Sequence, residues 1–369
     1  MSEIGIYRQL SAKEAVASLH LELWRHTMLG RIGCTVRRIS RRQMWIGIMS
    51  LLIFCAILSP GFFLDWRFYP AAWRLMFGPR SRSLTGRTFE PSPARLARGR
   101  YLVEGILGCF RCHSERDWDT LGAPPLPGKK GAGYDYAAQG NPRLIAPNIT
   151  PDSDTGAGSW TDDMLARSIR EGVGHDGRAL FPAMWYASFR HLSDEDVASV
   201  VVYVRSIPAV HHPLPQSNLN LIEKLTAAYL PEPITSPVPE PDQSERVKRG
   251  AYLATLADCA GCHTSHYHPK APVHEKPFGG GNLIAGPIHN VMSPNITFDP
   301  SGISYYTDDI FISVMRTGKI GARSLDPVMP WGVYRNLSDE DRCCQRVVGL
   351  AWPRRSQHPG VSSHGAHTP

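Results

Sequence analysis

Two copies of the pattern C-x-x-C-H, Cys109 to His113 and Cys259 to His263, constrain this chain more than any other feature. On one turn of helix, residues three and four positions apart share a face, so two thiols can bond a porphyrin edge while the adjacent imidazole reaches its iron. This is the attachment pattern of a c-type haem. We therefore predict two covalently bound haems c. The first would be attached through Cys109 and Cys112, with His113 as an iron ligand, and the second through Cys259 and Cys262, with His263 as an iron ligand.

A C-x-x-C pair also occurs in redox-active disulfides and in zinc sites. Zinc pairs usually lie within some tens of residues of each other, whereas these pairs lie 150 residues apart and each is followed at once by histidine. The spacing favours haem at both positions.

The sequence around each pattern is repeated as well. Four further motifs keep the same order in both copies, at an offset that drifts only from 151 to 145 residues. They are Arg98 to Leu102 and Arg249 to Leu253 (R-G-x-Y-L), Pro147 to Thr150 and Pro294 to Thr297 (P-N-I-T), Trp160 to Asp163 and Tyr306 to Asp309, and Leu192 to Asp196 and Leu337 to Asp341 (L-S-D-E-D). The chain is therefore predicted to hold two copies of one domain of about 100 residues.

These motifs resemble those of the dihaem class I cytochromes c, especially the cytochrome subunits and partners of bacterial membrane-bound dehydrogenases. The resemblance rests on R-G-x-Y-L before the haem pattern, N-I-T-P-D-x-x-T-G-x-G-x-W after it, and P-A-M followed by L-S-D-E-D. It covers about residues 93–212 and 244–341. It implies an all-α fold, two tandem class I cytochrome c domains and a role in electron transfer.

Met184 and Met329 are the predicted sixth ligands of the first and second haem iron. Both stand nine residues before the serine of L-S-D-E-D, beside prolines that fix the backbone. A thioether favours Fe(II), so His/Met ligation raises the reduction potential and leaves no open position for substrate. Met292 is the reserve ligand for the second haem, whereas Met164 and Met315 fall inside predicted helices and are expected to pack in the core.

The secondary structure is predicted to be helical. Residues 95–112 and 247–262 form the helices that deliver the cysteines, and 161–172 and 307–318 form a second pair. Residues 193–207 form a further helix, with Ser193 as N-cap. Its buried stripe consists of Val197, Val200, Val201 and Val204.

Two stretches are interpreted as connections. Residues 208–243 contain eight prolines and are expected to act as a fairly stiff spacer between the two domains. The segment with His266, His268 and His274 is interpreted as a solvated loop, because no cysteine or carboxylate cluster completes a metal site there.

Residues 44–64 carry no charge and are long enough to span a hydrocarbon core of about 30 Å. Arginines precede this stretch, so the positive-inside rule leaves residues 1–43 in the cytoplasm and the haem domains in the periplasm. A cleaved signal peptide is the alternative, although its apolar region would usually be shorter. Residues 1–36 are interpreted either as an amphipathic helix on the cytoplasmic face of the membrane or, equally, as the result of a misassigned start codon. The prediction is a single-pass anchor in the bacterial inner membrane.

The net charge of +7 does not indicate a nucleic-acid partner. The basic excess lies at the two ends of the chain, and residues 65–341 hold 28 Lys and Arg against 30 Asp and Glu.

The last segment, 342–369, departs from the repeat. At the offset of 145, the valine stripe of the first copy maps to Arg342, Gln345, Arg346 and Gly349. We expect a divergent, disordered tail there, arising from a shifted reading frame or from ordinary divergence.

The predicted order of segments is a cytoplasmic segment 1–43, a transmembrane helix 44–64, a juxtamembrane linker 65–92, a first cytochrome domain 93–212, a proline-rich linker 213–243, a second cytochrome domain 244–341 and a tail 342–369. The predicted function is a membrane-anchored dihaem cytochrome that relays single electrons, without catalytic activity of its own. The donor would be a dehydrogenase or quinol-oxidising complex, and the acceptor a cytochrome or oxidase. Alternatives are a haem enzyme, such as a dihaem peroxidase or sulfur-compound oxidase with one exchangeable iron site, and a haem-storage protein.

Overall fold

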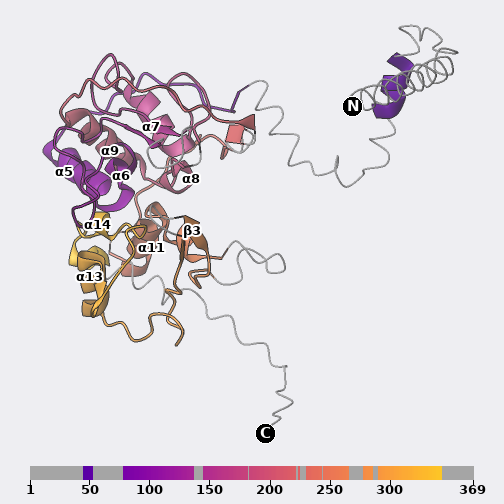
Figure 1. Cartoon of the computed structure of the whole chain (residues 1–369). Helices are drawn as coiled ribbons and strands as arrows, with labels where there is room; N and C mark the ends of the chain where they lie inside the picture. The colour runs from indigo at the N-terminus through magenta and orange to yellow at the C-terminus, as the bar shows by residue number, and fades with distance from the viewer. Residues whose placement is uncertain are drawn as a thin grey trace, which may run out of the picture. The chain divides into compact units, whose positions relative to one another are not determined.

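The computed structural model describes residues 45–52, 78–136, 144–181, 183–221, 223–224, 230–242, 244–265, 277–285 and 290–342 (Figure 1). The chain divides into two units, Met1–Tyr69 and Pro70–Pro369. In the first unit, residues 45–52 form a helix with exposed side chains. The rest of the predicted span 44–64, and residues 1–43, lie outside the described residues. No helix in the described part of the chain is long and apolar enough to cross a membrane.

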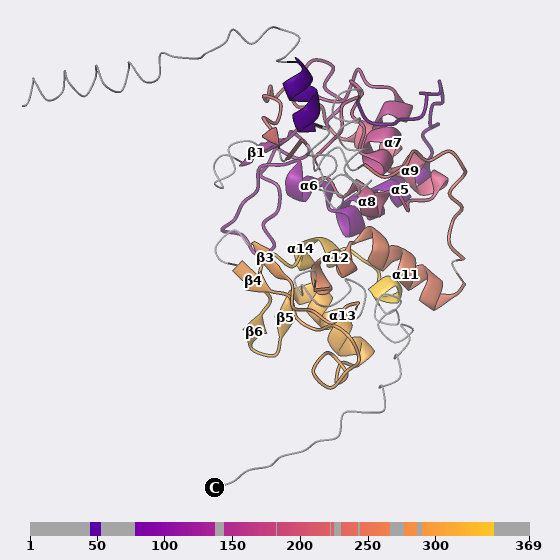
Figure 2. The same ribbon diagram turned by 90° about the vertical axis from the view of Figure 1, so that its right-hand side faces the viewer.

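The second unit is mainly helical, as predicted, and its helices follow the same order before and after the proline-rich segment (Figures 1 and 2). Before that segment come α5 (Pro93–Leu102), the π-helix η1 (Val103–Leu107), α6 (Cys109–Cys112), α7 (Asp162–Glu171), α8 (Tyr186–Phe189) and α9 (Asp194–Ser206). After it come α11 (Arg246–Leu256), α12 (Cys259–His263), α13 (Asp308–Thr317) and α14 (Trp331–Tyr334). Equivalent stretches of the two sequence repeats therefore form equivalent helices.

The strands are short and pair only with their neighbours in sequence. The described residues form three antiparallel two-stranded ladders: β1 (Tyr134–Asp135) with β2 (Ile145–Ala146), β3 (Leu283–Ala285) with β4 (Asn290–Met292), and β5 (Lys319–Ile320) with β6 (Arg323–Ser324). In register, Tyr134 lies opposite Ala146, Leu283 opposite Met292 and Lys319 opposite Ser324. These ladders shape loops and form no common sheet.

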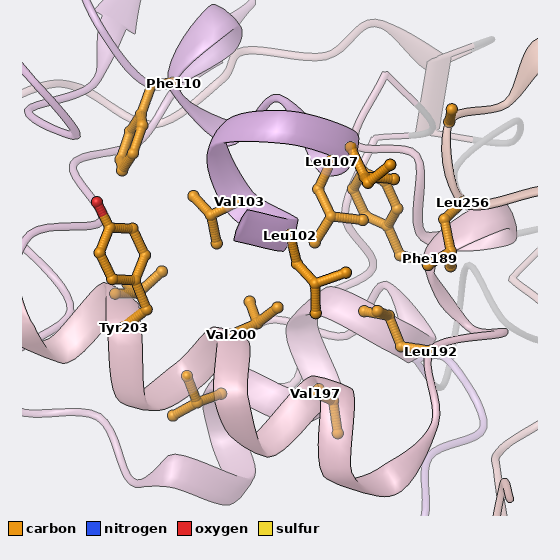
Figure 3. Close-up of a cluster of buried hydrophobic side chains, with 14 of the residues drawn as sticks. Leu102, Val103, Leu107, Phe110, Phe189, Leu192, Val197, Val200, Tyr203 and Leu256 are labelled. Carbon is orange, nitrogen blue, oxygen red and sulfur yellow. The ribbon is translucent and has the colours of Figure 1, made fainter. Parts of the chain in front are cut away.

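The core of the first repeat lies where α5 and η1 pack on α9 (Figure 3). Leu102 and Val103 face Val197 and Val200 of α9, and these side chains are at most 1% exposed. The predicted valine stripe is confirmed, and each buried valine contributes about 1.5 kcal/mol. Gly99, the glycine of R-G-x-Y-L, is where the two helices touch, because a Cβ there would collide with the backbone of Ser199.

The helix caps follow the sequence signals. The side chain of Ser193 accepts a hydrogen bond from the backbone N–H of Asp196 (3.0 Å), which confirms the predicted N-cap. Thr161 and Thr307 cap α7 and α13 in the same way. These two helices end at Gly172 and Gly318, which have φ values of 68° and 67°. A side chain at either glycine would meet an aromatic ring of α8 or α14, so both need glycine.

The prediction of one continuous helix over 95–112 was wrong. After α5 the backbone widens into η1, and Gly108 then adopts a left-handed conformation (φ 60°) before α6 begins. In the second repeat, Asp258 (φ 52°) separates α11 from α12, so the predicted helix 247–262 is interrupted at the same place. The cysteines therefore sit on short helices of their own, turned away from the preceding helix axis.

The described part of the proline-rich segment packs on the first repeat. The carbonyl of Val210 accepts a hydrogen bond from Asn148 Nδ2 (2.8 Å), and Ser217 Oγ bonds both backbone groups of Ile145 (3.0 and 3.1 Å). Leu230 is 4% exposed and packs with Val173 and Tyr186. This segment thus forms a wall of the first repeat, a role that the prediction of a spacer did not include.

One hydrophobic cluster spans both repeats. It joins Leu102 and Phe189 of the first to Leu253, Leu256 and Leu337 of the second. The described chain ends at Arg342, which is helical and 1% exposed, and whose guanidinium donates to the carbonyl of Arg335 (2.6 Å). Arg342 is therefore part of the folded second repeat, although the sequence places it in the divergent tail. Residues 343–369 lie outside the described residues, as do His266, His268 and His274.

Candidate functional site

The four cysteines of the two C-x-x-C-H patterns lie on α6 and α12, and none of them forms a disulfide. Burial, and secondarily the neighbouring Cys112 thiol, raises the pKa of Cys109 to about 12. Burial and the Asp258 carboxylate raise the pKa of Cys259 to about 12 as well. A redox-active C-x-x-C pair needs a thiolate with a lowered pKa, so this environment argues against that alternative.

The imidazole of each pattern is held by a backbone carbonyl from the P-N-I-T motif. His113 Nδ1 lies 2.7 Å from the carbonyl oxygen of Pro147, and His263 Nδ1 lies 2.9 Å from that of Pro294. A carbonyl can only accept, so Nδ1 carries the proton and Nε2 keeps a free lone pair. Burial lowers the pKa of both histidines, which favours the neutral ring. A neutral imidazole fixed through one nitrogen is the form in which histidine binds metals.

The asparagine of P-N-I-T explains why this carbonyl is so placed. Asn148 Oδ1 accepts hydrogen bonds from the backbone N–H (2.9 Å) and the hydroxyl (2.7 Å) of Thr150. Asn295 and Thr297 make the same two bonds at the same distances. Each Asx turn fixes the backbone just after the proline. The sequence shows the repeated motif but not this role, because the functional atom belongs to the main chain.

A cavity of about 620 Å³ adjoins the first C-x-x-C-H pattern. Cys109, Cys112, His113 and Met184 all line it, so the structure brings together every residue predicted for the first haem. Its volume lies within the range of about 300–1,000 Å³ typical of ligand pockets. The remaining wall is mostly apolar and includes Ile106, Leu107, Ile149, Trp160, Leu165, Phe189 and Val204.

The two predicted methionine ligands lie in equivalent backbone turns, one in each repeat. The N–H of Met184 donates to Phe181 (3.0 Å), and its carbonyl accepts from Tyr186 (2.6 Å). Met329 makes the equivalent bonds with Asp326 (3.0 Å) and Trp331 (2.8 Å). Both side chains are half-buried against the hydrophobic cluster.

Met292 and Met315 differ from these two in exposure. Met292, the reserve ligand, is 58% exposed on β4. Met315 is 6% exposed in α13, as expected of a core residue.

The second repeat contributes to the first cavity. Pro330, Val333 and Tyr334 line it beside the first pattern. Tyr334 is 3% exposed, and its hydroxyl donates a hydrogen bond to the carbonyl of Ala257, two residues before Cys259 (2.9 Å). The two patterns, far apart in the sequence, therefore lie on either side of one buried tyrosine. No motif in the sequence indicates this proximity.

The proline-rich stretch also contributes to the wall of the cavity. Gln216, Ser217, Leu219 and Lys224, from the proline-rich stretch, line it. A sequence pattern of prolines and polar residues resembles a spacer, so it does not indicate a pocket wall.

Comparison with known proteins agrees with the motifs. No protein-family model matches the chain. The fructose dehydrogenase cytochrome subunit of Gluconobacter japonicus is 30% identical over 259 residues, which cover 65% of this chain and 49% of that subunit. The alcohol dehydrogenase (quinone) cytochrome c subunit of Gluconacetobacter polyoxogenes is 26% identical over 319 residues, 82% of this chain and 63% of that subunit. A diheme cytochrome c-type protein of Cereibacter sphaeroides is 28% identical over 167 residues, 42% of this chain and 53% of that protein.

The chain thus spans about half to two thirds of the length of these relatives. The sequence identity between the chain and these relatives is modest. However, the relatives include cytochrome subunits of dehydrogenases that are named for different substrates. The resemblance inferred from the motifs is confirmed: the chain is a homologue of the cytochrome c subunits of bacterial dehydrogenases.

Proposed function

We propose that this chain is an electron-transfer cytochrome that carries two covalently bound haems c. The observation that carries the proposal is the hydrogen bond from histidine Nδ1 to a proline carbonyl, made once beside each pair of cysteines. It leaves Nε2 of His113 and of His263 as the ligand atom at two separate sites. The apolar cavity at the first site, which Cys109 and Cys112 line, fits a haem attached through these two cysteines.

The residues of each repeat have distinct tasks in this proposal. Cys109 and Cys112, or Cys259 and Cys262, anchor the haem through thioether bonds. His113 and Met184 would bind the iron of the first haem, and His263 and Met329 would bind that of the second. The haem supplies an iron that takes up and gives back one electron at a time. The apolar wall of the first cavity would exclude water. Met184 and Met329 lie in equivalent turns, which favours a methionine ligand at both irons over an exchangeable site.

The proposed organisation is two tandem class I cytochrome c domains, 93–212 and 244–341, behind an anchor at 44–64. The uncharged stretch and the arginines before it support a single pass through the bacterial inner membrane with the haem domains in the periplasm. The names of the relatives support a dehydrogenase as electron donor. The proposed acceptor is a second cytochrome or an oxidase.

Haem content of cysteine variants tests the assignment of the two sites. We expect two haems per chain in the wild-type protein by the pyridine haemochrome assay after acid denaturation. Cys109→Ala/Cys112→Ala and Cys259→Ala/Cys262→Ala should each retain one. The matched control is Cys343→Ala/Cys344→Ala, an adjacent pair without a following histidine, which should retain two. Wild-type protein with fewer than two covalent haems would overturn the proposal.

A further inference from the structure

The repeated arginine and tyrosine of R-G-x-Y-L have different partners. Arg98 forms a two-pronged ion pair with Asp196 of its own repeat (2.7 and 2.8 Å). Tyr101, three residues later, instead donates its hydroxyl to Asp341 of the other repeat. The motif thus contains one contact within the repeat and one contact between repeats.

The second copy makes the reciprocal contacts. Arg249 pairs with Asp341 of its own repeat (2.6 Å), and the hydroxyl of Tyr252 donates to Asp196 of the first repeat (2.6 Å). Both aspartates are the last residue of L-S-D-E-D, and they are 3% and 2% exposed. Each buried carboxylate is therefore shared by its own arginine and the tyrosine of the other copy.

The backbone completes the symmetry. The N–H of Ser193 donates to the hydroxyl of Tyr252 (3.1 Å), and the N–H of Ser338 donates to that of Tyr101 (3.2 Å). Burial and the bond to Asp341 raise the pKa of Tyr101 to about 12, so the hydroxyl keeps the proton that it donates. The same four-residue constellation occurs twice, related by exchange of the two repeats, as in the interface of a symmetric dimer.

Neighbouring contacts connect this interface to the C-x-x-C-H patterns. Ser188 of α8 donates to the carboxylate of Asp258, the residue just before Cys259 (2.9 Å). In the opposite direction, Asn336 donates to the backbone carbonyl of Glu104, in η1 shortly before Cys109 (2.9 Å). Each repeat thus contacts the segment just before the cysteine pair of the other repeat.

We propose that Tyr101 and Tyr252 are positioning residues that dock the two repeats as a fused dimer and hold the two haem sites at one fixed separation. The inference rests on the proposed function for the haems, but the docking itself needs only the contacts above. Without the two tyrosine hydroxyls, each aspartate keeps its arginine, and the shared hydrophobic cluster loses no apolar side chain. The loss should therefore affect the relation between the repeats more than the repeats themselves.

Paired substitutions test this docking in the haem-loaded protein. Tyr101→Phe/Tyr252→Phe removes both hydroxyls and keeps both rings. By calorimetry, we expect the single unfolding transition of the wild type to split in this variant, with the first component lower by on the order of 5 °C. By pulsed electron paramagnetic resonance of the oxidised protein, we expect one narrow haem-to-haem distance in the wild type and a broad distribution in the variant.

The matched control is Tyr203→Phe. Tyr203 also donates its hydroxyl to a carboxylate, that of the partly buried Glu104, but both residues belong to the first repeat. This variant should lose stability while it keeps a single transition and the narrow distance. If Tyr101→Phe/Tyr252→Phe behaves like Tyr203→Phe in both measurements, the positioning role is excluded. Absence of haem absorption in the wild type would instead contradict the proposed function.

Discussion

The hydroxyl of Tyr334 donates a hydrogen bond to the carbonyl of Ala257, while its ring lines the cavity that also holds Cys109 and His113. One side chain from the second repeat therefore contacts the surroundings of both C-x-x-C-H patterns. In the first repeat the equivalent position, at the offset of 145, is Phe189, which also lines the cavity. The hydroxyl of Tyr334 is thus the feature that distinguishes the two positions.

Substitutions of Tyr334 should separate ring from hydroxyl. We expect Tyr334→Ala to lower the free energy of unfolding by about 3–5 kcal/mol, because it leaves a void between the repeats. Tyr334→Phe should cost about 1–2 kcal/mol through the unpaired Ala257 carbonyl. Denaturant unfolding measures both changes in free energy. The control is Tyr305→Ala, because the side chain of Tyr305 is 63% exposed. Equal effects of Phe and Ala at this position would show that the ring contributes nothing.

The two Asx turns that position the proline carbonyls bonded to His113 and His263 should differ in how much they stabilise the fold. Besides its bonds to Thr150, Asn148 donates to Val210 (2.8 Å) and Thr155 (3.1 Å) and is 3% exposed. Asn295 has one such further partner, Ser301 (2.9 Å). We expect Asn148→Ala to cost about 2–4 kcal/mol and Asn295→Ala about 1–2 kcal/mol in denaturant unfolding. The reverse order would contradict the role of the proline-rich segment as part of the first repeat.

Asp163 should make the first repeat sensitive to acid. Burial opposes its ionisation, but hydrogen bonds from Arg82 (2.8 Å) and the backbone of Thr85 (2.6 Å) outweigh this and hold its pKa well below the usual range. Because an unfolded aspartate has a pKa of about 3.9, the stabilisation is complete above that pH and is lost as pH falls toward the folded value.

We therefore expect Asp163→Asn to lower the free energy of unfolding by about 3 kcal/mol at pH 7. The difference in free energy of unfolding between this variant and the wild type should become smaller below about pH 4. Asp154→Asn, at an exposed carboxylate, is the control and should have the same free energy of unfolding as the wild type at pH 7 and at pH 3. A difference that stays constant from pH 7 to pH 3 would mean that the charge of Asp163 is not what stabilises the fold.

The methionine ligands can be tested one haem at a time. We expect Met184→Ala and Met329→Ala each to lower the midpoint potential of one haem and to let that haem bind carbon monoxide, because loss of the thioether destabilises Fe(II) and vacates a coordination site. Met292→Ala, at the exposed reserve position, should change neither property. If Met292→Ala and not Met329→Ala opens the second haem, the ligand assignment of the second repeat is wrong.

Features with a local signature were predictable from the sequence. The valine stripe of α9 and its Ser193 cap follow from side-chain periodicity and capping chemistry, and both are confirmed. The cavity brings Cys109, Cys112, His113 and Met184 together, as the order of motifs implied. Such residues are visible because their own side chains perform the task.

Features that depend on backbone or on distant contacts were not predictable. The carbonyls of Pro147 and Pro294 act through main-chain atoms, which no residue type marks. The left-handed turn at Gly108 interrupts a stretch whose helical periodicity continues on both sides. The bond from Tyr101 to Asp341 joins residues 240 positions apart, and a repeat pattern alone cannot tell whether such partners lie in the same copy.

A redox titration of the purified full-length protein, followed by its haem absorption, tests most directly whether it is a two-haem electron relay. We expect two reversible one-electron transitions of equal amplitude, both from low-spin haems that do not bind carbon monoxide, because the proposed ligands of each iron are a histidine and a methionine. A single transition, or a high-spin haem that binds carbon monoxide in the unmodified protein, would contradict this function.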